Sequence, residues 1–138
     1  MSQERVEIVR QGIEAWNRHD FELGAMGGSV PLDTLFDRTD PNLVVFELDL
    51  YWVTRGGADP LTYISRYPGR VHLVHVKDSA GPPEHRQVDV GKGTIDFGKI
   101  LSQREQAGIR HAFVEMDEPT NALETLRVSY QYLAQLRF

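Results

Sequence analysis

Three short apolar runs of this 138-residue chain each end in ionisable side chains. The runs span residues 43–50, 71–76 and 111–116. Asp49, His75 and Glu115 occupy matching places near the ends of these runs. Carboxylate oxygens and an imidazole nitrogen, in a chain without cysteine, form a donor set that suits Mn²⁺, Mg²⁺, Co²⁺ or Zn²⁺. The pattern therefore indicates a divalent-metal site without selecting the metal.

Each of these residues also has an ordinary structural interpretation. An aspartate at the end of a strand is often a helix cap, and a histidine in an apolar strand is often a hydrogen-bonded core group. The recurrence of the pattern in three successive runs favours the metal interpretation. Residues two apart on a strand share a face, which places further ionisable side chains beside the three. These are Glu47, Lys77 and Asp117. We expect Glu47 to pair with a neighbouring cation or hydrogen-bond donor.

Parallel strands would bring these side chains together. The runs are short, rich in Val and Phe, and bounded by turn residues, as buried parallel strands are. The expected strands are residues 43–49, 71–76 and 110–115. The expected helices are residues 31–36, 59–64, 95–107 and 121–136. This alternation predicts an α/β fold with a parallel sheet. Ligands in such folds bind at the carboxyl ends of the strands, so the ionisable residues should meet at one mouth.

The composition narrows the classes of partner. Lys and Arg number 15 and Asp and Glu number 20, which gives a net charge of −5. An acidic chain has no general attraction for nucleic acid or anionic membranes, so neither is an expected partner. No apolar run approaches the roughly 20 residues that span a bilayer, and no secretory signal opens the sequence. With no cysteine for disulfides, a cytoplasmic location is expected.

Five segments, in their order and spacing, carry a resemblance to a known family. They read ELDLYW (47–52), GGADP (56–60), PGRVHLVHVKD (68–78), VGKGTIDF (90–97) and VEMD (114–117). This succession resembles the sugar phosphate isomerase/epimerase family, which has a xylose-isomerase-like (β/α)8 TIM barrel. An eight-fold barrel takes about 250 residues. The resemblance therefore implies a partial TIM barrel of the last three to four βα units, over residues 23–138.

The resemblance also implies an activity. Members of the family are divalent-metal enzymes that isomerise, epimerise or dehydrate sugars and keto-sugars. The expected reaction is proton transfer next to a carbonyl, through a metal-stabilised enediolate. By the same resemblance, the metal ligands are Asp49, His75 and Glu115, and the catalytic residues are Glu115, Lys77 and His19.

Three side chains are implied as substrate contacts. Trp52 resembles a sugar-stacking wall of the pocket, although a core aromatic is an equal alternative. Lys77 resembles a group that faces substrate oxygens, and its alternatives are a solvated lysine or a partner of Asp78. Lys92 lies in Gly91–Gly93, a loop at the edge of the site that lacks the glycine spacing of a P-loop.

The chain departs from the family in residues 1–23. The segment WNRHDFEL (16–23) resembles a family strand in which the position of Asn17 carries a fourth metal ligand. Asn is a poor ligand for transition metals, and His19 is the expected substitute. Residues 1–22, with helical spacing over 3–16, resemble the opening helix of SnoaL-like polyketide cyclases and are expected to form a separate N-terminal helix.

Half a barrel allows more than one function. An open barrel exposes two sheet edges, and a homodimer that completes the barrel would cover them. The first alternative is a non-catalytic barrel remnant that keeps the family residues. The second is a SnoaL-like small-molecule binding domain, which requires antiparallel strands after residue 30.

Overall fold

The computed structural model describes residues 31–137, and the chain divides into two compact units after Val44. The first contains α2 (Pro31–Arg38), with Pro31 at its start, where a fixed φ suits the first helical turn. Thr39 Oγ1 donates to the Leu35 carbonyl as the helix ends. His19, the expected helix over residues 3–16 and the expected boundary at residues 22–23 lie outside the described residues.

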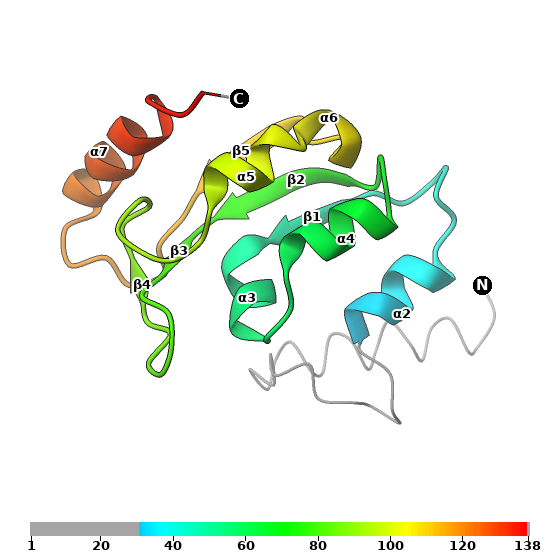
Figure 1. Cartoon of the computed structure of the whole chain (residues 1–138), viewed down its shortest axis with the longest axis horizontal. Coiled ribbons are helices and arrows are strands. Elements are labelled where there is room, and N and C mark those ends of the chain that lie inside the picture. The colour runs from blue at the N-terminus through cyan, green and yellow to red at the C-terminus, as the bar shows by residue number, and fades with distance from the viewer. Residues whose placement is uncertain (1–30, 138) are drawn as a thin grey trace. The chain divides into compact units, whose positions relative to one another are not determined.

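Three parallel strands form the main sheet, in the order β1-β2-β5 (Figure 1). They are β1 (Phe46–Asp49), β2 (Val71–Val76) and β5 (His111–Val114). The register pairs Asp49 with His75, and His75 with Phe113. The predicted parallel α/β fold is therefore confirmed, and this sheet is not the antiparallel sheet that a SnoaL-like fold requires. Within the described residues the sheet is open, with β1 and β5 as its edges.

The first strand begins later than the sequence predicts. Residues 41–43 form a turn in which Leu43 N and Val44 N both donate to the Asp40 carbonyl. The Asp40 side chain also accepts from Asn42 N, which is a local bond that competes with strand pairing. Leu43 is 82% exposed as a result, so it is not part of the buried strand.

Five helices follow in the second unit. They are α3 (Leu50–Arg55), α4 (Pro60–Arg66), α5 (Phe97–Ser102), α6 (Arg104–Ala107) and α7 (Ala122–Leu133). Two of these helices have typical caps: the Asp59 side chain accepts from Leu61 N at the start of α4, and Gly108 ends α6 with a φ of 83°. The single helix expected over residues 95–107 was wrong, because the chain breaks at Gln103 into α5 and α6.

Helix α3 and a short hairpin were not predicted. Helix α3 follows β1 without a loop, and Asp49 is both the last strand residue and the helix N-cap. The hairpin joins β3 (Asp78–Ser79) to β4 (Gln87–Val88) as an antiparallel pair. Each of its strands has two residues, which is too short to show an alternating pattern in the sequence.

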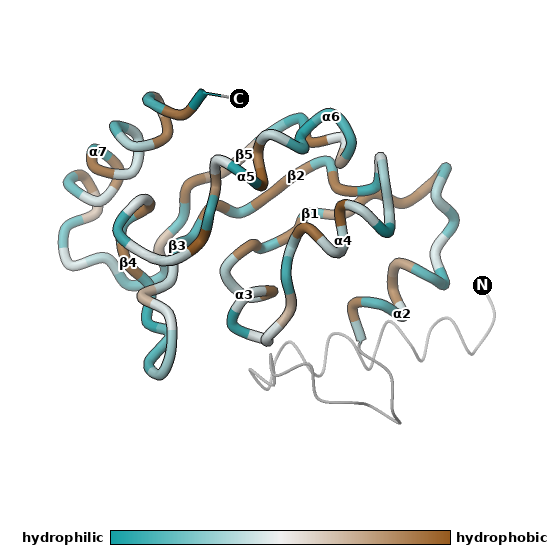
Figure 2. Tube along the Cα trace, viewed as in Figure 1, coloured by the Kyte–Doolittle hydropathy of each residue, from teal (hydrophilic) through white to brown (hydrophobic). Residues whose placement is uncertain are grey.

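The core lies between one face of the sheet and the helices. Its fully buried strand residues include Leu48, Val74 and Val76, and its helical residues include Ile64 and Phe97. Figure 2 shows hydrophobic segments along β2 and within the helices. The sheet positions between these residues carry the ionisable side chains, because successive strand residues face opposite ways. The core thus holds the strands in the register that brings those side chains together.

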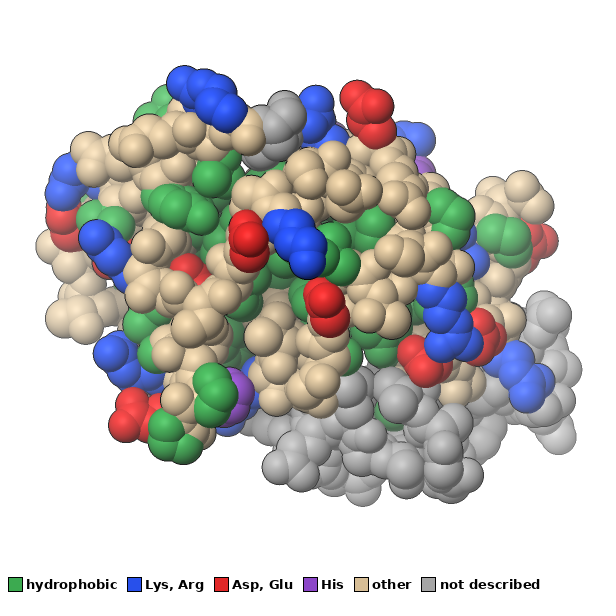
Figure 3. Space-filling view, viewed as in Figure 1, with side chains coloured by type: hydrophobic (Ala, Val, Ile, Leu, Met, Phe, Trp, Pro, Cys, Tyr) green, Lys and Arg blue, Asp and Glu red, His purple; other side chains and the backbone are tan. Residues whose placement is uncertain are grey.

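The outer surface mixes charges of both signs. On the face in Figure 3, Lys and Arg alternate with Asp and Glu and do not gather into one basic patch. Among residues 31–137, no helix combines the length and the apolar character needed to span a lipid bilayer.

Candidate metal centre

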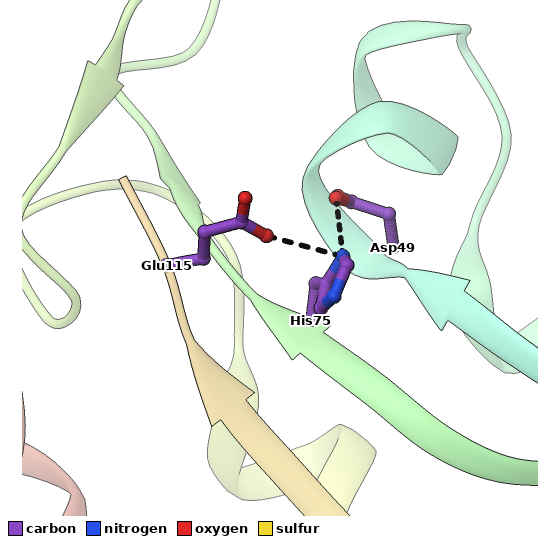
Figure 4. Close-up of side chains that lie close together, drawn as sticks. All are labelled: Asp49, His75 and Glu115. Atoms are coloured by element: carbon purple, nitrogen blue, oxygen red, sulfur yellow. Dashed lines mark hydrogen bonds and ion pairs between the residues drawn. The ribbon is translucent and has the colours of Figure 1, made fainter. Parts of the chain in front are cut away.

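Asp49, His75 and Glu115 point toward one another from the ends of the three strands (Figure 4). Asp49 ends β1, His75 lies next to the end of β2, and Glu115 follows β5 directly. One donor atom from each residue lies within 4.8 Å of the others. The adjacency follows from the parallel register, which sets Asp49 beside His75 and places Glu115 two residues beyond the partner of His75.

The His75 ring stands at the centre of this group. Its Nδ1 lies 3.3 Å from Asp49 Oδ2 and 3.2 Å from Glu115 Oε2. Its Nε2 lies 3.1 Å from Glu47 Oε1, so the ring touches a carboxylate on both sides. This contact agrees with the expectation that Glu47 pairs with a neighbouring donor.

The donor set fits a divalent cation. Glu115 Oε2 is buried, although 41% of its side chain is exposed, and it has no directional hydrogen bond among the described residues. It is within ion-pair distance of His75 and Lys77, but their alignment is not that of a hydrogen bond. A buried carboxylate oxygen in this condition has coordination capacity left over. Two carboxylate oxygens and an imidazole nitrogen supply hard ligands of the kind that bind Mn²⁺, Mg²⁺, Co²⁺ or Zn²⁺.

The Lys77 ammonium lies among the carboxylates of Asp49, Glu115 and Asp117. Its side chain is 5% exposed, and its Nζ lies 3.2 Å from both Asp49 Oδ2 and Glu115 Oε2. Its shortest contact, at 2.9 Å, is with Asp117 Oδ1. The expected alternative of a pair with Asp78 was wrong, because Asp78 turns toward backbone amides instead.

The contacts of Lys77 and Asp117 shift both pKa values. Burial is the largest influence on the Lys77 ammonium and lowers its pKa, but contacts with Asp117, Asp49 and Glu115 outweigh burial and raise the pKa above 10.5. Burial likewise raises the pKa of Asp117, but Lys77, Gln87 and His75 outweigh it and hold the pKa below 3.8.

A pH dependence of stability follows from these two shifts. The raised pKa of Lys77 contributes stability that is full below pH 10.5 and is lost as the pH rises through the folded value. The lowered pKa of Asp117 contributes stability above pH 3.8 that is lost as the pH falls through its folded value.

We expect Lys77→Met to lower the free energy of unfolding most between about pH 3.8 and pH 10.5, as measured by urea denaturation across pH. Lys99→Met, at an exposed position on α5, is the control. If Lys77→Met loses as much free energy of unfolding well above pH 10.5 as it does near neutral pH, the prediction is wrong.

The other expected site residues lie in different places. Trp52 is on the first turn of α3, where its backbone N–H donates to Asp49 Oδ1 at 3.0 Å and its ring contacts Tyr51 and Arg55. Lys92 is exposed on the loop after Val90, and its side chain makes no ion pair with the cluster in the described structure. His19 lies outside the described residues. The geometry thus brings Lys77 to the three candidate ligands and leaves Lys92 apart.

Sequence reasoning missed two residues that support the site. Gln87, on β4, accepts from Asp117 N at 2.8 Å and donates through its side chain to Asp117 Oδ2. Asp78 is 1% exposed and accepts from the backbone amides of four residues. These residues are Ser79, Gly91, Gly93 and Ile95. The Asp78 side chain, directly after Lys77, fixes the loop of residues 91–95, and no spacing of residues in the sequence indicated this role.

Known structures match most of the chain. Two structures of a sugar phosphate isomerase/epimerase from Parabacteroides distasonis ATCC 8503 match 78% of the chain, at 29% and 30% identity with TM-scores of 0.63 and 0.65. A xylose isomerase domain protein from Alicyclobacillus acidocaldarius matches 77% of it at 19% identity, with a TM-score of 0.57, and shows the fold alone. The matches cover only 37%, 36% and 41% of those chains.

Sequence comparison agrees over a shorter stretch. Over 47 residues, the chain is 43% identical to an inosose dehydratase from Geobacillus kaustophilus, covering 34% of this chain and 15% of that enzyme. No family model matches the sequence. The resemblance to sugar phosphate isomerase/epimerases is therefore confirmed for the C-terminal portion of the chain, which spans well under half the length of these relatives.

Proposed function

We propose that this chain, with the fold of sugar phosphate isomerase/epimerases, acts as a divalent-metal-dependent isomerase or epimerase of a sugar, sugar phosphate or keto-sugar. The convergence of Asp49, His75 and Glu115 at the carboxyl ends of three parallel strands carries the proposal. The names of the matching structures support the substrate class. Cytoplasmic location remains a prediction.

The described residues suggest how the reaction would be divided among side chains. Asp49, His75 and Glu115 would hold Mn²⁺, Mg²⁺, Co²⁺ or Zn²⁺, which polarises a carbonyl and stabilises the charge that develops beside it. Glu115 would take the proton from the carbon next to the carbonyl, since a carboxylate at the reacting centre can serve as a general base. Lys77 would donate a hydrogen bond to a substrate oxygen, and Trp52 would form a wall of the pocket.

What happens after proton removal would distinguish an isomerase or epimerase from a dehydratase. In an isomerase or epimerase the proton returns to carbon, either at the neighbouring position or on the opposite face. In a dehydratase the same proton removal is followed by loss of the hydroxyl group one carbon further on, which leaves as water and creates a double bond. The short match to an inosose dehydratase favours this second outcome as the alternative reaction.

Deuterium exchange tests the shared first step before the product is known. The chain is incubated with Mn²⁺ in D₂O and a panel of ketohexoses and their monophosphates, and deuterium at the carbon next to the carbonyl is followed by NMR. We expect exchange with at least one compound and no exchange with Glu115→Gln. Absence of exchange across the panel, with Mn²⁺ bound, would favour the non-catalytic remnant.

We further propose that two copies of the chain associate through the open edges of the sheet. Strands β1 and β5 are both edges among the described residues, and Phe113 on β5 is 48% exposed. A second copy would supply three more parallel strands, which suits a chain that covers 36–41% of the length of its matching structures. The exposed apolar side chains of α7 would add to the same contact. These are Leu123, Leu126 and Tyr130.

Native mass spectrometry with Mn²⁺ measures association and metal content together. We expect a dimer with about one metal per chain, and a monomer for Phe113→Glu, because a charge in a buried apolar contact is strongly unfavourable. Ser65→Glu, on the exposed side of α4, should remain dimeric. A monomeric wild type would show that the proposed association is wrong, and the metal content in the same spectrum would test the metal site separately.

A further inference from the structure

Lys77 has one carboxylate partner that is not a candidate metal ligand. Its Nζ lies 3.2 Å from Asp49 Oδ2 and from Glu115 Oε2, and both of these residues belong to the candidate metal centre. The third partner is Asp117, whose Oδ1 accepts a hydrogen bond from Nζ at 2.9 Å. Asp117 can therefore hold the ammonium whether or not Asp49 and Glu115 coordinate a cation.

Gln87 holds Asp117 at two points. Its side-chain amide donates to Asp117 Oδ2, and its Oε1 accepts from Asp117 N at 2.8 Å. Since the backbone N–H can only donate and an ionised carboxylate can only accept, this orientation of the amide is the one that satisfies both contacts. The Asp117 side chain is 41% exposed, so the grip of Gln87 limits the rotation of a carboxylate that would otherwise be free to turn into water.

The hairpin of β3 and β4 joins these contacts into a closed ring (Figure 1). β3 begins at Asp78, directly after Lys77, and Ser79 pairs with Gln87 across the hairpin. The backbone thus leads from Lys77 to Gln87, and the side-chain hydrogen bonds return through Asp117 to Lys77. The hairpin therefore sets Gln87 against the segment that follows β5.

We propose that Gln87 is a positioning residue that acts through Asp117 and holds the Lys77 ammonium in place to donate to a substrate oxygen. The inference rests on the proposed function, in which Lys77 donates that hydrogen bond. A lysine side chain loses much rotamer freedom when it is fixed, and a carboxylate held in one orientation meets that cost before the substrate binds. Both side-chain hydrogen bonds of Gln87 in the described structure go to Asp117, so its loss should affect Lys77 and not metal binding.

Loss of Gln87 should therefore separate turnover from metal affinity. Gln87→Leu keeps a side chain of similar size and removes both hydrogen bonds, and Gln106→Leu, exposed on α6, is the matched control. With Mn²⁺ present, we expect Gln87→Leu to slow the deuterium exchange of the substrate by about tenfold or more. Calorimetric titration should show wild-type affinity for Mn²⁺ in both variants. Equal losses of exchange and of Mn²⁺ affinity in Gln87→Leu would indicate general damage to the site and overturn the inference.

A double substitution tests whether Gln87 acts through Asp117. Asp117→Ala removes the carboxylate that accepts from Lys77 and that Gln87 holds. Because Gln87 then has no carboxylate to orient, adding Gln87→Leu should slow the exchange no further than Asp117→Ala alone. Two effects that multiply fully would show that Gln87 acts by another route, and the inference would be wrong.

The ammonium itself can be observed without substrate. Side-chain ¹H–¹⁵N spectra at mildly acidic pH detect lysine ammonium groups whose protons exchange slowly with water, and a Lys77→Met sample assigns the signal. We expect the Lys77 protons to exchange faster in Gln87→Leu than in the wild type and in Gln106→Leu, both without metal and with diamagnetic Mg²⁺. An unchanged rate in Gln87→Leu would overturn the inference. A wild type that exchanges no substrate deuterium would overturn the proposed activity instead, and the lysine spectra would still decide whether Gln87 positions Lys77.

Discussion

Glu115→Gln is expected to weaken Mn²⁺ binding by more than about 100-fold in calorimetric titration of the full chain. Loss of a residue that only orients a ligand costs about 10- to 100-fold, so loss of a ligand should cost more. The substitution keeps the size of the side chain and replaces a charged ligand with a neutral one. The substitution also removes the ion pair between Glu115 and Lys77. Lys77 keeps its ion pairs with Asp49 and Asp117.

A matched control guards against a general effect of charge. Glu118→Gln removes an exposed carboxylate three residues further along the same segment and should bind Mn²⁺ as the wild type does. Thermal unfolding should be similar for both variants in the absence of metal. Binding by Glu115→Gln within about twofold of the control would exclude Glu115 as a ligand, and the metal site would then have to be reassigned.

Asp78→Ala is expected to lower the free energy of unfolding by about 3–5 kcal/mol. The Asp78 carboxylate is buried and accepts from four backbone amides, at distances between 2.8 and 3.2 Å. Alanine would leave the N–H groups of Ser79 and Ile95, whose hydrogen bonds are buried, and those of Gly91 and Gly93, whose hydrogen bonds are part-buried, without this acceptor. Losing an acceptor for buried N–H groups is more costly than losing an exposed hydrogen bond. The native state has a margin of only about 5–15 kcal/mol, so the variant should unfold at a much lower urea concentration.

Asp96→Ala provides the comparison within the same chain. Asp96 is an exposed N-cap of α5 and accepts from a single amide, that of Lys99. Loss of such a cap costs about 1 kcal/mol. If Asp78→Ala is no more destabilising than Asp96→Ala in urea denaturation, the loop of residues 90–95 does not depend on the Asp78 carboxylate.

The loop of residues 90–95, which hydrogen-bonds to Asp78, also contacts helix α7. Val90 N donates to Ser129 Oγ at 3.1 Å, and Gly91 lies so close to Tyr132 that a Cβ there would come within 2.3 Å of the ring. Asp78→Ala should therefore loosen α7 as well as the loop, and hydrogen exchange of the α7 amides would report it.

The sequence was sufficient where its signals are local or repeated. β2 was predicted at its observed bounds, because VHLVHV is an apolar run with turn residues on both sides. The expected helix over residues 59–64 matches the start of α4 closely, because Asp59 is a residue type that is preferred at N-caps. The expected helix end at residue 107 matches α6, because Gly108 is a residue type that is preferred just after a helix. The convergence of Asp49, His75 and Glu115 followed from one rule about parallel strands, applied three times.

The unpredicted parts depend on contacts between distant residues. Asp49 could be either a strand end or a helix cap, and it is both, so the start of α3 was hidden inside an apparent strand. Asp78 follows Lys77 directly, which suggested an ion pair between them. Its carboxylate turns instead to amides 13 to 17 residues away, and no spacing rule indicates such a choice.

The cap at the end of β1 has a consequence for which cations the site accepts. Asp49 Oδ1 is occupied by Trp52 N, so only Oδ2 faces His75 and Lys77. Two-oxygen chelation by Asp49 would require the first turn of α3 to give up its cap. Calcium takes six to eight oxygens and readily uses both oxygens of a carboxylate, whereas Mg²⁺ and the transition metals accept fewer ligands. The helix that begins at Asp49 thus restricts the denticity of a ligand, and this restriction disfavours Ca²⁺.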